Sequence, residues 1–217
     1  MDKIIEECAE LDYAWLPSTV GDFSLTIDTC IDGDFYRLFH YQNQAGWRWE
    51  ALYDKEVEDY TVHIVMPLFS FVDINFIKTK ISEFWHILQE RMVQEMEGLF
   101  ISLEKRFTYQ YRKKGLDNWD FSKYLPSSIG PFTCDITPSN AIKMINGSYI
   151  IAEYKDSTNK NGLLLFYNVF RDEFFAELRH HNYPEINHDL DADSITALEV
   201  ALDTSLITVL RELENRL

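Results

Sequence analysis

The densest group of potential ligands in the sequence is the segment HHNYPEINHDLDAD, residues 180–193. It carries imidazole groups at His180, His181 and His188 among several carboxylates, and these are the side chains that bind zinc and other divalent ions. A metal-dependent hydrolase is therefore one hypothesis. Polar side chains are equally typical of a surface loop, and the matching segment of the first half, VMPLFSFVDIN, has no histidine. We therefore favour a protein without cofactors and keep these histidines as the alternative.

The other signatures of catalysis are missing from the sequence. It contains no GxSxG motif for a serine nucleophile and no glycine-rich motif that would hold nucleotide phosphates. The three cysteines, Cys8, Cys30 and Cys134, are odd in number and widely spaced, so they predict free thiols in a reducing compartment and no disulfide framework. The sequence therefore predicts a protein that is not an enzyme.

Aromatic side chains form a second group with functional potential. Large rings gather in protein cores, in protein interfaces and in pockets for apolar ligands. Residues 35–53 are rich in them, and two of the tryptophans have no tryptophan counterpart in the second half of the chain. Core packing is the most common role of such rings, and the functional alternative that we carry forward is an interaction or ligand-binding surface in the first half. Its candidate residues are Trp47, Trp49, Tyr53 and Tyr41.

The charge of the chain indicates what kind of partner it could bind. The formal net charge is −16, and residues 1–109 carry 20 acidic against 9 basic side chains. We do not expect the protein to bind nucleic acid, because such binding depends on clustered Lys and Arg side chains. The longest uncharged apolar stretch, IVMPLFSFV, is too short to span a membrane, and the N-terminal residues MDKIIEECAELD do not resemble a secretory signal. We expect a cytoplasmic protein that binds no membrane and favours a basic protein partner.

A repeated octet indicates how the chain is organised. LPSTVGDF at residues 16–23 returns as LPSSIGPF at residues 125–132, with five identical positions. After each octet the same order of patterns follows: period-two alternation typical of strands, turns with glycine, and a long stripe of apolar residues at helical spacing. This order predicts a tandem duplication.

The predicted fold is therefore α+β, with two halves related by a pseudo-two-fold axis. Each half is expected to contain a four-stranded antiparallel sheet followed by a long amphipathic helix. The first half spans residues 1–114 and the second spans residues 115–217. Within them, the strands are predicted at about 23–66 and about 132–180, and the helices at about 75–104 and about 194–217.

Three functions fit these patterns. The first is a non-enzymatic, acidic, protein-binding module of the kind served by inhibitors, immunity proteins and adaptors. The second is a carrier or sensor that holds a small apolar ligand between sheet and helix. The third is the metal-dependent hydrolase that would use the histidine-rich segment.

Overall fold

The chain folds into two compact units, Met1–Ile101 and Ser102–Leu217. The computed structural model describes residues 1–158 and 160–216. Each unit combines helices with one antiparallel sheet, so the α+β class is confirmed. No helix among the described residues has the length and apolar character needed to cross a membrane. The two units are described separately below.

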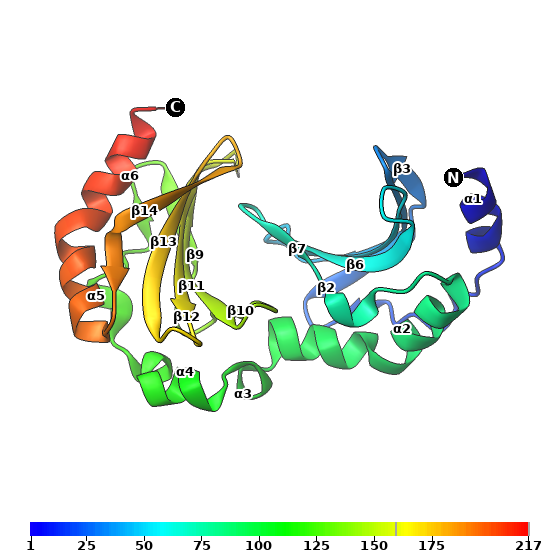
Figure 1. Cartoon of the computed structure of the whole chain (residues 1–217), viewed down its shortest axis with the longest axis horizontal. Helices are drawn as coiled ribbons and strands as arrows, with labels where there is room; N and C mark the ends of the chain where they lie inside the picture. The colour runs from blue at the N-terminus through cyan, green and yellow to red at the C-terminus, as the bar shows by residue number, and fades with distance from the viewer. Residues whose placement is uncertain (159, 217) are drawn as a thin grey trace. The chain divides into compact units, whose positions relative to one another are not determined.

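The first unit contains a sheet of seven strands in the order β1-β2-β4-β5-β6-β7, with β3 paired to β4. A helix precedes the sheet in sequence, and a long helix lies along one of its faces (Figure 1). The elements are α1 (Asp2–Ala9), β1 (Thr19–Val20), β2 (Phe23–Thr26), β3 (Cys30–Asp32), β4 (Phe35–Gln42), β5 (Arg48–Asp54), β6 (Asp59–Val65), β7 (Ser70–Val72) and α2 (Ile81–Met96).

The second unit has a sheet with the same order of strands. Its path is β8-β9-β11-β12-β13-β14, with β10 paired to β11, and helices again cover one face (Figure 1). The elements are α3 (Leu103–Arg106), α4 (Tyr109–Lys114), β8 (Ser128–Ile129), β9 (Phe132–Ile136), β10 (Ile142–Lys143), β11 (Ser148–Lys155), β12 (Gly162–Asn168), β13 (Glu173–His180), β14 (Tyr183–Ala192), α5 (Ile195–Ala201), a π-helical turn (Leu202–Leu206) and α6 (Ile207–Glu214).

The repeated octet forms the first hairpin of each sheet. Val20 pairs with Phe23 around a two-residue turn whose glycine, Gly21, has φ 61°. The same turn occurs at Gly130, with φ 55°. A glycine with positive φ at the first turn position fits a type II′ hairpin, in which an L side chain would be strained. Both octets therefore need glycine at this turn position, because the backbone there has a positive φ.

The proline of each octet has a second structural role. The hydroxyl group of Tyr41 on β4 donates a hydrogen bond to the carbonyl oxygen of Pro17 over 2.8 Å. Tyr154 on β11 donates to Pro126 over the same distance, 2.8 Å. Both tyrosines are fully buried, so each bond fixes the hairpin to a central strand.

Each sheet also contains a β-bulge at the same place. The register of β4 against β5 shifts between Arg37 and Phe39, and the register of β11 against β12 shifts between Ile150 and Ala152. A bulge inserts one residue and bends the strand. The two sheets therefore agree in strand order and in this irregularity.

The sequence predicted four strands in each sheet, and the structure has seven. The predicted four correspond to β2, β4, β5 and β6 and to their counterparts in the second unit. Most of the additional strands are only two or three residues long, so period-two alternation had too few positions to reveal them. The longest, β14, was interpreted as a loop because it is an edge strand whose residues are mostly exposed and polar.

The bounds of the two long helices differ from the predicted ones. The first was expected from about residue 75, but Ile74–Phe76 forms a separate 3-10 turn, capped by the Asp73 side chain, and the helix starts at Ile81. The second runs from Ile195 through its π-helical turn to Glu214, while the predicted end at residue 217 lies outside the described residues. The apolar stripes are confirmed: both helices bury them against their sheet.

Residues 102–114 precede the expected junction and pack within the second unit. Arg106 donates to the carbonyl oxygens of Asn140 and Ala141 at 2.9 and 3.1 Å. The buried hydroxyl group of Tyr111 donates to the Pro138 carbonyl at 2.7 Å. The α4 helix is thereby fixed to the second unit and precedes its octet, as α1 precedes the octet of the first unit.

Candidate functional site

The four aromatic residues singled out in the sequence lie in the interior of the first unit. Tyr41, Trp49, Tyr53 and Trp47 are between 0 and 8% exposed. The ring of Trp49 lies 6.2 Å from that of Phe39, stacked at the sheet face that α2 covers. Three of the four are therefore core residues. Tyr53 is the exception, since its ring also borders a recess in the surface.

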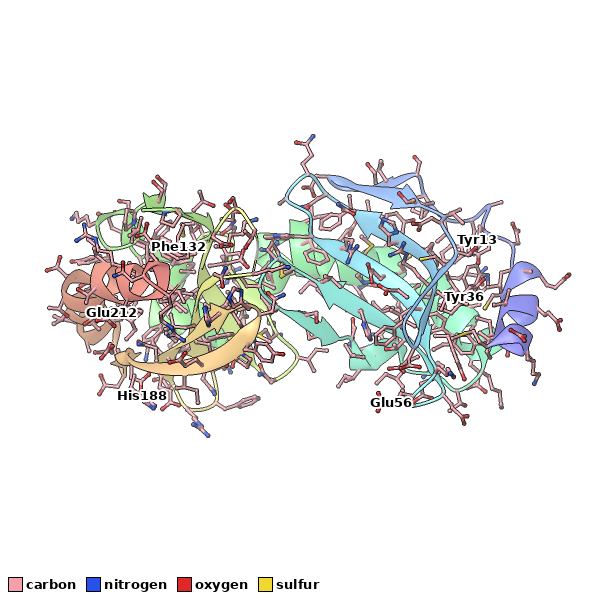
Figure 2. The ribbon with its side chains drawn as sticks, turned by 90° about the horizontal axis from the view of Figure 1, so that it is seen from above. Tyr13, Tyr36, Glu56, Phe132, His188 and Glu212 are labelled. Atoms are coloured by element: carbon pink, nitrogen blue, oxygen red, sulfur yellow. The ribbon has the colours of Figure 1, made fainter. Side chains whose placement is uncertain are left out.

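Two of the three candidate metal ligands lie together, since the ring centroids of His180 and His181 are 4.4 Å apart, and His188 lies away from them along β14. His180 and His181 stand at the turn between β13 and β14, where the His180 Nε2 atom lies 3.2 Å from the Arg216 carbonyl oxygen. His188 lies on the exposed β14, with Nδ1 2.7 Å from Asp191 Oδ2 (Figure 2). Among the residues that the structure describes, no three His, Cys, Asp or Glu side chains form a group that could hold a metal ion.

A recess of about 470 Å³ opens in the first unit where three elements meet. Its walls are α1, the turn between β5 and β6, and the start of α2, and the rings of two tyrosines lie on its sheet side. Figure 2 labels Glu56, which lies on the same turn but outside the recess. The lining residues are Lys3, Ile4, Glu7, Tyr53, Glu58, Tyr60, Thr79, Lys80, Ile81 and Ser82.

The local sequence explains how the recess forms. Tyr53 on β5 and Tyr60 on β6 are directly opposite partners in the sheet, and their ring centroids lie 4.9 Å apart. Opposed residues of an antiparallel pair place their side chains on one face, so both rings point the same way. Glu58, with φ 59°, closes the tight turn between the two strands. The buried Cys8 anchors α1 over this end of the sheet.

Several carboxylates surround the recess. The pKa of Tyr53 is raised, first by burial and then by the negative charges of Glu58, Asp59, Asp54 and Glu7. Four carboxylates that act on one hydroxyl group indicate a negative potential at this end of the sheet. The recess therefore suits a cationic group.

The two lysines of the lining do not neutralise this charge from inside. The ammonium group of Lys3 lies 3.4 Å from Glu7, and its side chain is 85% exposed. Lys80 pairs with Glu83 at 3.0 Å, and its side chain is 70% exposed. Both lysines extend from the rim into solvent, where such pairs contribute little.

The Tyr60 phenol of the lining and the Cys8 thiol that contacts it are held in protonated form. Burial raises the pKa of the Cys8 thiol to about 11, against an opposing effect of the Tyr60 hydroxyl group. Burial likewise raises the pKa of Tyr60 above its usual range. Since the thiolate is the reactive form of cysteine, this thiol is unreactive at neutral pH.

A second hollow, of about 570 Å³, lies in the second unit between β13, β14 and the start of α5. Its rim carries both signs of charge, and Arg171 pairs with Glu173 there at 3.2 Å. The lining also carries the carboxylates of Asp191 and Asp193, of which Asp191 pairs with His188 at 2.7 Å. Its lining residues are Arg171, Glu173, Phe174, Phe175, Asp191, Ala192, Asp193 and Ala197.

The face of the first sheet opposite α2 carries a charged cluster. His40, Glu50 and His63 occupy directly opposite positions on β4, β5 and β6. The Glu50 Oε1 atom forms ion pairs with Arg48 Nε at 2.9 Å and with Arg37 Nη1 at 3.7 Å. These three residues include two imidazoles and a carboxylate, which are possible ligands for a cation. The Glu50 carboxylate is already paired with Arg37 and Arg48, so little negative charge is left for a cation to bind.

Comparison of the chain with protein-family models, with curated proteins and with solved structures gave no match.

The sequence contained part of the signal for the recess. Alternation along β5 and β6 places Tyr53 and Tyr60 on the same face as the core, and the acidic run EVED at 56–59 marks the turn beside them. The contribution of Glu7 from α1 could not be inferred, because nothing in the sequence states where a short N-terminal helix docks.

Proposed function

We propose that this protein is a non-enzymatic binding module that docks a basic segment of a partner protein in the recess of its first unit. The observation that carries the proposal is the combination of two tyrosine rings with the carboxylates of Glu7 and Glu58 in one concave site. Complementary charge around an aromatic anchor is typical of protein interfaces. The net charge of −16 agrees with a cationic partner.

The chemistry of the recess supports binding over catalysis. Burial keeps the Tyr60 phenol of its lining and the neighbouring Cys8 thiol protonated, so these two groups cannot act as nucleophiles at neutral pH. The carboxylate oxygens at the rim can accept charge-assisted hydrogen bonds from a cationic partner. Inhibitors, immunity proteins and adaptors act by this kind of contact. The charged rim gives no support to an apolar ligand at this place.

We also infer that the chain arose by tandem duplication of one α+β unit. Three features support this: the common order of strands, the bulge at the same position, and the tyrosine-to-proline hydrogen bond that fixes each octet. If the two units had arisen independently, there would be no reason for corresponding strands, β4 and β11, to donate the same hydrogen bond to the proline of corresponding loops.

Pull-down from native lysate with two versions of the full chain tests the binding function. We expect a stoichiometric partner to bind the natural protein at low ionic strength and to be lost from a Glu7→Gln/Glu58→Gln double variant. Glu56→Gln, on the same turn but outside the recess, serves as the control and should retain the partner. Partner recovery that is identical for all three proteins would contradict docking at the recess.

A further inference from the structure

The second unit contains an ammonium group at the position that corresponds to the recess. Lys114, the last residue of α4, donates hydrogen bonds from Nζ to the Asp172 carbonyl oxygen at 2.9 Å and to its Oδ1 at 2.7 Å. A third bond runs to the Asp193 carbonyl oxygen at 2.8 Å. A lysine ammonium has three donors, so all of them are used.

Two aromatic rings lie against the same ammonium group. The Lys114 Nζ atom is 5.5 Å from the ring centroid of Tyr167 and 5.3 Å from that of Phe174. Its side chain is only 11% exposed. Rings at this distance attract a cation through their electron-rich faces, and more strongly where water is excluded.

The two rings have direct counterparts in the first unit. Tyr167 and Phe174 are opposite partners next to the β12–β13 turn, as Tyr53 and Tyr60 are next to the β5–β6 turn. Each pair stands one position before the turn closes, and the ring centroids lie 5.2 and 4.9 Å apart. The aromatic surface that contacts Lys114 therefore exists in both units.

The oxygen acceptors also have counterparts. Asp172 has φ 57° in its turn, and Glu58 has φ 59° at the same place in the other turn. The third acceptor, Asp193, lies two residues before the first residue of α5, and Thr79 lies two residues before the first residue of α2. All four counterparts, Tyr53, Tyr60, Glu58 and Thr79, line the recess.

The difference between the units lies in the helix that precedes the octet. In the second unit, α4 brings Lys114 into the site from within the chain. In the first unit, α1 forms the wall with Ile4 and Glu7, while Lys3 extends into solvent. The same acceptors and rings are therefore present without an internal ammonium group between them.

We propose that the recess of the first unit binds the ε-ammonium group of an unmodified lysine side chain, supplied by the basic segment of the partner. This inference rests on the proposed function and specifies the chemical group that the recess recognises. The Glu58 carboxylate and the Thr79 carbonyl accept from the ammonium group, and Tyr53 and Tyr60 supply the aromatic faces. Glu7 adds a second carboxylate from α1.

The arrangement predicts a clear order of preference among cations. A lysine ammonium offers three donors around one compact charge, whereas the arginine guanidinium is planar and directs its donors in a fixed fork. Trimethyl-lysine keeps the charge but loses all three donors. We therefore expect lysine to bind more tightly than both, and norleucine, which has the same chain without charge, not to bind.

Titration of the full-length protein with four pentapeptides tests this order. The peptides have blocked ends and the sequence GGXGG, where X is lysine, arginine, trimethyl-lysine or norleucine, and amide chemical shifts or calorimetry report binding at low salt. We expect the lysine peptide to bind at least about fivefold more tightly than the arginine and trimethyl-lysine peptides, since about 1 kcal/mol separates such affinities. Glu58→Gln should weaken lysine binding by about the same factor, and Glu56→Gln should leave it unchanged.

The outcomes separate the inference from the proposed function. Equal binding of lysine and arginine peptides, both lost in Glu58→Gln, would overturn the ammonium preference and leave a basic docking site. Tighter binding of trimethyl-lysine than of lysine would overturn the role of the three acceptors. Failure of all four peptides to bind would overturn the inference, and loss of the pull-down partner in the Glu7→Gln/Glu58→Gln variant would still support the proposed function.

Discussion

The Lys114 site of the second unit and the recess of the first unit share a backbone frame and differ in what occupies it. In both, two opposed aromatic residues, a turn residue with positive φ and the start of a long helix surround one small volume. Lys114 fills that volume in one unit, and α1 leaves it open in the other. Under our proposals, one duplicated fold uses the same position for stability in one copy and for binding in the other.

The helix before each octet decides this difference. The α4 helix ends at Lys114 because Gly115 follows with φ 86°, a left-handed cap that favours glycine. The position of the cap determines that the lysine is the last helical residue and lies over the Tyr167 and Phe174 rings. The first helix, α1, places Ile4 and Glu7 in the wall of the recess. It ends at Ala9 without a left-handed glycine cap.

The largest expected effect follows from removing the internal ammonium group. Lys114→Met should destabilise the protein by about 3 kcal/mol, because it deletes charge-assisted hydrogen bonds in a nearly buried site. Urea unfolding followed by circular dichroism measures this change. Lys113→Met, an exposed neighbour, is the control and should cost less than about 0.5 kcal/mol. Equal costs for the two variants would contradict a special role of Lys114.

The same variant should also change how stability depends on pH. The Lys114 hydrogen bond, with that of Tyr167, holds the pKa of Asp172 below its usual 3.8. A carboxyl group with a depressed pKa stabilises the folded state at neutral pH and loses that contribution as the pH falls through the depressed value. We expect Lys114→Met to flatten this acid decline, and ethylammonium ion to restore part of the lost stability.

The faces opposite the helices give the second prediction. Glu50 occupies the position that Leu164 has in the second sheet, and Arg37 precedes the bulge where Ile150 does. Glu50→Leu should cost about 2 kcal/mol, because Arg48 loses its carboxylate partner and Arg37 keeps only its ion pair with Asp28. The double variant Arg37→Ile/Glu50→Leu should recover more than half of that loss. A double variant less stable than the single would show that the two faces are not interchangeable.

The third prediction compares the two octets. Tyr41→Phe and Tyr154→Phe each remove one buried hydroxyl-to-carbonyl hydrogen bond, and each should cost about 1 kcal/mol. Hydrogen exchange measured by mass spectrometry assigns the loss to a unit, because faster exchange should be confined to the hairpin of the mutated copy. Costs that differ by more than about 1 kcal/mol would show that the two bonds have different structural weight.

The smallest effect concerns His63, whose counterpart in the second sheet is Glu177. Burial lowers the pKa of His63 from 6.5, although Glu50 and Asp54 act in the opposite direction. The unfolded state then binds the proton more readily, so stability should fall as the pH drops below about 6.5, with a slope of at most about 1.4 kcal/mol per pH unit. His63→Gln should remove that part of the slope, and an unchanged slope in this variant would contradict it.

Parts of the fold could be predicted from the sequence because their signals are local. Strands such as β13 alternate in burial from Glu173 to Arg179, and the apolar residues of α2 return at helical spacing. The octet was detectable because both copies have the same two structural requirements. Each needs a glycine in its turn, and each contains a proline whose carbonyl oxygen accepts a hydrogen bond from a buried tyrosine. The strands of two or three residues escaped prediction, because they depend on pairing with distant partners.

The candidate site was only partly accessible to sequence reasoning. Tyr53 was selected for the right property, an aromatic ring in the first half, but Trp47, Trp49 and Tyr41 share that property and lie in the core. Nothing local distinguishes a ring that borders a recess from one that packs against α2. The distinction depends on which helix covers each ring.

The sequence by itself determined the class of the fold, the repeated octet and the excess of acidic charge in the first half, because composition and periodicity do not depend on distant contacts. The tertiary structure alone decided that α1 leaves open the volume that α4 fills with Lys114. That choice depends on the docking of two short helices, and the free energy of docking comes from contacts between residues far apart in the chain.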